Sequence, residues 1–225
     1  MTINVRNREL KRKRIMSYFI SAAIEIIEQD GIGELSIRKV AEKAGYNSAT
    51  LYHYFSSLEE LTLFACAKCL NEYATELPSY LKQAKDMREQ YLLNWECFCN
   101  HSFCHPDIYQ VLFFSPAGAA NLPAVFKMYH EIFPMERSDS AAEYEEMLME
   151  GDFYKRDYIA LERIIQEKGY DIPPEDAMAV IEMNILIFRG MLAKMKDTVR
   201  TLTVKDAVKR TVTYMEHTLH SYHIG

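Results

Sequence analysis

The sequence has no apolar run that approaches the roughly 18 residues needed to span a membrane. Its first residues also lack the apolar core of a signal peptide, because the stretch NVRNRELKRKR is polar throughout. We therefore expect a cytoplasmic protein with no membrane partner.

The sequence also lacks the motifs of the common enzyme classes. It has no nucleophile motif, no glycine-rich phosphate loop and no pair of carboxylates in a context that indicates a cleft. Five cysteines, an odd number at irregular spacings, fit reduced thiols better than a disulfide framework. We expect no catalytic activity and no cofactor.

The length and charge of the chain indicate a globular protein with a basic N-terminal segment. With 225 residues, 49% of them hydrophobic, the chain can bury a full core. The formal net charge is −6, yet residues 1–14 contain six basic residues and Glu9 as their one acidic residue. This polarised charge indicates an anionic partner near the N-terminus.

Residues 15–55 contain three helical patterns separated by short breaks. Apolar residues recur at helical spacing from Ile15 up to a stop at Gly31. Ser36 can then cap a short helix, Gly45 can end that helix in the left-handed conformation, and Asn47 can cap a third helix, SATLYHYF. Two short helices joined by a turn that contains glycine have the helix-turn-helix outline.

The stretch LSIRKVAEKAGYNSATLYHYFSSLEEL, residues 35–61, resembles the DNA-binding segment of TetR-family transcriptional regulators. The resemblance extends over about residues 11–65. It implies an all-α fold, with an N-terminal three-helix helix-turn-helix DNA-binding domain over residues 1–60 and a larger helical ligand-binding and dimerisation domain over residues 61–225. The implied function is that of a homodimeric repressor, which binds a pseudo-palindromic operator in double-stranded DNA and is released by a small-molecule effector.

The third helix presents the candidate DNA-binding side chains. Four of them lie where a recognition helix reads bases in the major groove. Arg38 resembles a family arginine that reaches a base, and two further positions resemble phosphate contacts. For Arg38 the alternative is a surface arginine, and for Tyr54 it is a packing role. The candidates are Arg38, Ser48, Ala49, Thr50, Tyr52, His53 and Tyr54.

Three positions depart from the family pattern. Ser56 and Leu58 stand where lysines commonly meet phosphate, and Ala49 stands where glycine is frequent. The free amides at the start of helix four and the hydroxyls of Ser56 and Ser57 still offer a phosphate site. The missing charge nevertheless motivates an alternative, a protein-interaction module of the same fold with little DNA binding.

Beyond Leu61 the sequence predicts helices with no β alternation. We expect helix four to end at about Glu76, before Pro78, and a long helix over residues 139–168 interrupted only by Gly151. Two late helices of this sequence carry apolar seams. In the resembling family, two late helices pair with their copies across a two-fold axis. The alternative is packing within one chain. The dimer-interface candidates are Met178, Ile181, Ile185, Phe188, Leu192, Val208, Met215 and Leu219.

An aromatic and methionine-rich segment, residues 91–133, is the candidate effector site. Such a segment, broken by prolines, can line a cavity for an apolar or aromatic ligand, although it can equally form ordinary core. The pocket candidates are Tyr91, Trp95, Phe98, Phe113, Phe126 and Tyr129.

The same segment contains the run CFCNHSFCHP. On a helix, Cys97, His101 and Cys104 or His105 share one face at a spacing that can bind a metal or a haem. The paired motif of a zinc site is missing, so we expect buried thiols, ordinary histidines and no metal. A metal, haem or redox sensor remains the alternative.

Overall fold

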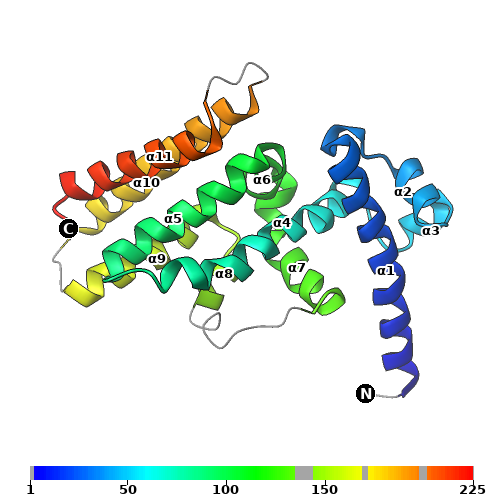
Figure 1. Cartoon of the computed structure of the whole chain (residues 1–225). Coiled ribbons are helices and arrows are strands. Elements are labelled where there is room, and N and C mark those ends of the chain that lie inside the picture. The colour runs from blue at the N-terminus through cyan, green and yellow to red at the C-terminus, as the bar shows by residue number, and fades with distance from the viewer. Residues whose placement is uncertain (1–2, 135–143, 169–171, 198–201, 225) are drawn as a thin grey trace.

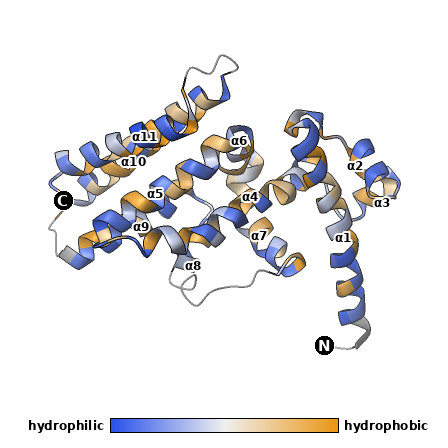
Figure 2. Ribbon diagram, viewed as in Figure 1, coloured by the Kyte–Doolittle hydropathy of each residue, from blue (hydrophilic) through white to orange (hydrophobic). Residues whose placement is uncertain are grey.

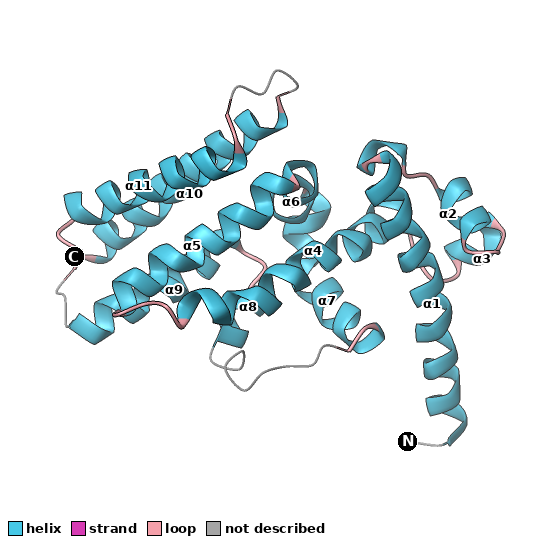
Figure 3. Cartoon of the chain, viewed as in Figure 1, coloured by secondary structure: helices cyan, strands magenta, loops and turns pink. Residues whose placement is uncertain are grey.

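The structure, a computed structural model, describes residues 3–134, 144–168, 172–197 and 202–224. All regular elements within these ranges are helices (Figure 3), so the all-α prediction is confirmed. The elements are α1 (Ile3–Asp30), η1 (Ile32–Glu34), α2 (Ile37–Lys43), α3 (Ser48–Tyr52), α4 (Leu58–Leu81), α5 (Met87–Cys104), α6 (Pro106–Phe114), α7 (Pro116–Ile132), α8 (Glu145–Met149), α9 (Phe153–Lys168), α10 (Pro174–Lys196) and α11 (Val204–Ser221).

Helices α1, α2 and α3 form a head at one end of the molecule (Figure 1). The predicted caps are present: Ser36 Oγ accepts a hydrogen bond from the Lys39 amide at 3.3 Å, and Asn47 Oδ1 accepts one from the Thr50 amide at 2.8 Å. Between them, Gly45 adopts the predicted left-handed conformation, with φ +78°. These local interactions define both short helices and the turn between them.

Helix α1 is longer than the sequence predicts. It is continuous from Ile3, so the basic residues of the N-terminal segment lie on a helix and not on an irregular arm. Figure 2 shows that the first half of this helix is mostly hydrophilic, while its second half packs on the head. Lys13 Nζ lies 2.9 Å from a carboxylate oxygen of Glu131 at the end of α7, which ties this extension to the rest of the chain.

Helix α4 leads from the head into the body of the molecule (Figure 1). Our prediction that it ends before Pro78 is wrong, because the helix continues to Leu81. A proline inside a helix removes one backbone hydrogen bond. Leu77 and Leu81 are buried on either side of Pro78, and their burial offsets that loss.

The body surrounds α5, which contacts α4, α9 and α11. The prediction that prolines break residues 91–133 is wrong at Pro123, which lies within α7 and does not end it. The predicted interruption at Gly151 is confirmed, because this residue lies between α8 and α9. A Cβ atom at Gly151 would lie 2.5 Å from the Pro123 ring, so this close approach requires a glycine. Asp139, the expected cap of the long helix, lies outside the described residues.

Helices α10 and α11 form an outer pair at the end of the body away from the head (Figure 1). Their bounds agree with the prediction of two late helices. Among the described residues no single helix is long and apolar enough to cross a membrane. Helices α6 and α7 reach that length only as a pair bent by 90°.

Candidate functional site

Helix α3 has one buried and one exposed face. Leu51 and Phe55 are completely enclosed, and the Phe55 ring meets that of Phe19 edge-on with centroids 6.3 Å apart. Tyr52, one position after Leu51, is 57% exposed although it is a large aromatic residue. Tyr52 is therefore available to a partner, whereas Leu51 and Phe55 hold α3 to the core.

The seven DNA-binding candidates divide by exposure. Arg38, Ala49, Tyr52 and His53 are exposed, whereas Ser48, Thr50 and Tyr54 are half-buried. The Tyr54 ring lies 6.1 Å from the Phe19 ring, so this residue packs against the core. The Thr50 hydroxyl donates to Asn47 Oδ1 at 3.0 Å.

The start of α4 is not a free phosphate site, which corrects our expectation for Ser56 and Ser57. The Glu60 carboxylate accepts hydrogen bonds from both the backbone N–H and the hydroxyl of Ser56, each at 2.6 Å. Ser57 Oγ accepts a hydrogen bond from the Glu60 amide at 3.2 Å. The Ser56 hydroxyl and the Ser57 oxygen are therefore engaged within the protein, and a carboxylate lies beside this helix N-terminus.

The basic extension of α1 provides the positive charge of the head. Arg6, Arg8 and Lys11 are exposed and form no ion pair with any residue that the structure describes. Arg14 Nε donates to the Tyr18 hydroxyl at 2.9 Å. Exposed, unpaired cations of this kind can neutralise phosphates and release counterions on binding.

The head matches a family model. Residues 19–63 match the model described as "Bacterial regulatory proteins, tetR family". The chain carries a TetR-type DNA-binding domain. This TetR-type segment includes α2, α3 and the start of α4, in agreement with the resemblance seen in the sequence.

Two curated relatives match part of the chain. The fatty acid metabolism regulator protein of Bacillus subtilis is 25% identical over 83 residues, which cover 37% of this chain and 42% of the relative. The HTH-type transcriptional regulator BetI of Brucella canis is 32% identical over 71 residues, which cover 32% of this chain and 36% of the relative. The matched region thus spans less than half the length of these relatives.

The whole chain is similar in fold to solved TetR-family structures. One is the repressor FadR of Thermus thermophilus in complex with lauroyl-CoA, with 13% sequence identity and a TM-score of 0.55 over 91% of this chain and 94% of that one. At this identity the likeness shows the fold alone. The head and the body therefore share one TetR-type architecture.

The six pocket candidates of the TetR-type body are all buried. Trp95 and Phe98 line a cavity of about 20 Å³ between α4, α5 and α9, and Tyr91 lines a neighbouring cavity of similar size. Phe113 packs at a tilt against Phe153 of α9, with ring centroids 5.0 Å apart. Phe126 and Tyr129 pack against the ring of His130, on α7.

A buried polar cluster at this position was missed by our sequence analysis. Asp157 accepts hydrogen bonds from the Tyr91 hydroxyl and from Trp95 Nε1, both at 3.0 Å. Asn184 Nδ2 in turn donates to the Tyr91 hydroxyl at 2.8 Å, so the chain of hydrogen bonds joins α9, α5 and α10. Burial raises the pKa of Asp157 to about 7, against the opposing effect of these hydrogen bonds.

A larger hollow of about 850 Å³ lies between the head and α7. Its lining includes Met16 and Arg12 of α1, residues 56–60 at the start of α4, and Val125 and Met128 of α7. None of the six aromatic pocket candidates lines it.

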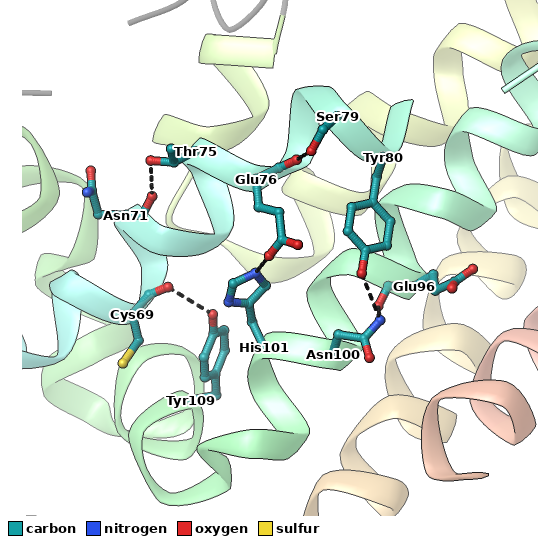
Figure 4. Close-up of polar contacts among 10 residues, drawn as sticks. All are labelled: Cys69, Asn71, Thr75, Glu76, Ser79, Tyr80, Glu96, Asn100, His101 and Tyr109. Carbon is teal, nitrogen blue, oxygen red and sulfur yellow. Dashed lines mark hydrogen bonds and ion pairs between the residues drawn. The ribbon is translucent and has the colours of Figure 1, made fainter. Parts of the chain in front are cut away.

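The cysteines and histidines of residues 97–105 lie apart. Cys97 is fully buried and burial raises the pKa of its thiol, whereas Cys104 and His105 are exposed. His101 Nε2 lies 2.6 Å from a carboxylate oxygen of Glu76 on α4 (Figure 4). The described residues contain no group of three metal-ligating side chains.

The late helices bury most of the dimer-interface candidates inside the chain. Only Met178 is exposed, and the other seven pack within the core, as the alternative of packing within one chain describes. A side chain buried in its own chain is not available to a partner. The outer faces of α10 and α11 instead expose Met183, Leu186 and Tyr214.

Proposed function

We propose that the chain is a cytoplasmic, homodimeric transcriptional repressor that binds a pseudo-palindromic operator and releases it when a small molecule binds in the body. The observation that carries this proposal is the exposed aromatic face of α3 beside its buried anchors, Leu51 and Phe55, in a head that matches the TetR model. A recognition helix held in this way can enter the major groove with Tyr52 and His53 at base edges.

Dimerisation and DNA reading form one mechanism in this proposal. A two-fold axis beside α10 and α11 would present two recognition helices to two half-sites of an operator. The exposed Met178, Met183 and Leu186 of α10 support this placement, since they form an apolar surface on the outer helix pair.

Effector binding would act by selecting a second spacing of the two heads. A ligand shifts this equilibrium only if it binds that second arrangement more tightly. Helix α4 is the proposed lever, because its N-terminus packs in the head and Tyr73 near its middle packs in the body.

Selection of bound sequences from a random duplex pool tests DNA recognition. We expect a pseudo-palindrome to be enriched and the affinity for it to fall steeply with salt, through counterion release. Tyr52→Ala should weaken binding at least about tenfold. Tyr158→Ala is the matched control, because Tyr158 is an exposed tyrosine of α9, far along the chain from the head.

A protein-interaction module with little DNA binding is the second candidate. The observation that favours it is the Glu60 carboxylate at the start of α4, which places negative charge where phosphate contacts are expected. If no sequence is enriched and binding stays weak at low salt, this second candidate replaces the first.

A further inference from the structure

Arg156 is a buried arginine without a counterion. Its side chain is on α9 and the residue is only 4% exposed. Nη1 donates to the carbonyl oxygen of Leu148 at 3.3 Å, whereas the buried Nη2 has no hydrogen-bond partner. Arg156 forms no ion pair with any residue in the described ranges. A buried guanidinium without an anion destabilises the fold, which indicates a role for this charge other than stability.

Aromatic rings surround this guanidinium. Its central carbon lies 5.4 Å from the ring centroid of Tyr73, 5.8 Å from that of Phe98 and 5.6 Å from that of Phe113. Cation–π contacts of this kind recover part of the lost hydration. They provide no acceptor for Nη2, which therefore remains a donor available to a ligand.

Asp157, the neighbouring residue, forms no ion pair with Arg156. Both of its carboxylate oxygens already accept hydrogen bonds, from Tyr91 and from Trp95. With its pKa near 7, the Asp157 carboxyl is also only partly ionised at neutral pH. The positive charge of Arg156 is therefore only partly balanced.

Arg156 lines the 20 Å³ cavity together with Tyr73, Asn94, Trp95, Phe98, Phe153 and Asp157. The Asp157 oxygens are held by Tyr91 and Trp95, so Arg156 is the group of this lining that can bind an anion. Asn94 offers a second donor there, because its Nδ2 has only a weak acceptor, the sulfur of Met147 at 3.7 Å. The lining contains a single cation, which suits one carboxylate better than a phosphate dianion. Its remaining surface is mainly aromatic, which suits a planar ring in offset or edge contact.

We propose that Arg156 receives the carboxylate of a small aromatic acid whose ring enters the aromatic cluster between α4, α5 and α9. This inference rests on the proposed function, since it names the chemical class of the effector. In the present state the cavity has room for a single water molecule. Ligand binding therefore selects a conformation with an opened lining, and Tyr73 transmits the opening to α4.

Trp95 is the one tryptophan of the chain, and it lines the cavity, so its fluorescence reports on this site. We would titrate the full-length protein, without DNA, with benzoate and phenylacetate and with the neutral amides of the same ring size, benzamide and phenylacetamide. We expect the acids to change Trp95 emission in a saturable manner. The amides should bind at least about tenfold more weakly, because they lack the charge-assisted hydrogen bonds.

Arg156→Met is the test variant, since it removes the charge and keeps an unbranched side chain. Replacing an unpaired buried charge by an apolar group is compatible with folding, and circular dichroism would check this. We expect the variant to bind the acids at least about tenfold more weakly and no better than the amides. Arg189→Met is the matched control, because Arg189 stacks at 4.7 Å over the ring of Phe114 but is exposed, and it should leave acid binding unchanged.

Equal binding of acids and amides to the native protein overturns the proposal, and so does an absence of any response up to millimolar acid. If Arg156→Met does not fold, the comparison of acids with amides on the native protein still decides. Because these titrations contain no DNA, they are independent of operator binding. Protein that binds the acids but no duplex refutes the repressor, whereas protein that binds an operator but no acid refutes only the ligand class.

Discussion

The carboxylate of Glu60 binds the backbone N–H and the hydroxyl of Ser56 at the start of α4. This places an acidic group at the end of the head where the resembling family commonly has lysine. The chain thus places a negative charge beside the proposed DNA surface.

Glu60→Gln should strengthen operator binding. The substitution keeps the length of the side chain and removes its negative charge, so repulsion of phosphate falls. We expect a several-fold gain in affinity at low salt that shrinks as salt screens the charge. Fluorescence anisotropy with a labelled operator measures the affinity and its dependence on salt.

Glu162→Gln, at a half-buried position of α9, is the control. An unchanged affinity for Glu60→Gln would place the start of α4 away from the phosphates.

Leu51→Ala should mainly lower the stability of the protein, whereas Tyr52→Ala should mainly weaken its binding to DNA. Leu51 is fully buried, so its truncation should lower the free energy of unfolding by about 2–5 kcal/mol. Tyr52 is 57% exposed, so its truncation should change that free energy by only about 0.5 kcal/mol and act on DNA binding. Urea denaturation separates the two. Comparable destabilisation by both substitutions would mean that Tyr52 is a packing residue.

Asp157 should make the protein less stable as pH rises from about 4 to 7. Burial raises the folded-state pKa of its carboxyl from 3.8 to about 7, so the unfolded chain releases this proton at lower pH than the folded chain does. The favourable contribution is complete below pH 4 and is lost as pH rises through 7, amounting to a few kcal/mol.

Denaturation of the native protein and of Asp157→Asn across this pH range measures the contribution. Asparagine preserves the shape and cannot ionise, so the difference in unfolding free energy between the two proteins should vary with pH. A constant difference between native protein and Asp157→Asn would mean that Asp157 keeps an ordinary pKa.

Leu186→Glu should dissociate the proposed dimer. Leu186 is 56% exposed on the outer face of α10, and a charge in the centre of an apolar interface is strongly unfavourable. We expect sedimentation equilibrium to show monomers with an unchanged circular dichroism spectrum. Tyr154→Glu, at an exposed position of α9, should leave the assembly intact. A Leu186→Glu protein that remains dimeric would move the interface to another face.

The head was predictable because its determinants are close in sequence. The side chains of Ser36 and Asn47 each accept a hydrogen bond from the backbone amide three residues later. Gly45 adopts its left-handed conformation without a distant partner. The third helix is shorter than the predicted SATLYHYF, because α3 ends at Tyr52. Phe55 nevertheless faces the same side as Leu51, since its N–H donates to the Leu51 carbonyl at 3.1 Å. The extension of α1 to Ile3 was missed because charged residues hide helical periodicity in a segment with little apolar face.

The body was less predictable because its contacts join distant residues. Asp157 meets Tyr91 across 66 positions, and Asn184 meets Tyr91 across 93. One local signal was present: Arg156 and Asp157 stand three and four residues after Phe153 and four before Ala160 and Leu161, on the face that is otherwise apolar. Charged residues at such positions indicate a buried polar site, whereas the apolar seams of α10 and α11 alone could not distinguish a core from a dimer interface.

Lys13 already has an anionic partner within the protein. Its ammonium group already holds the carboxylate of Glu131 on α7, so contact with an operator phosphate would require an exchange of one anion for another. Such an exchange releases a protein carboxylate as well as a salt ion. The slope of log affinity against log salt concentration would then indicate fewer released ions than the number of phosphates contacted. DNA binding would also weaken the attachment of α1 to α7.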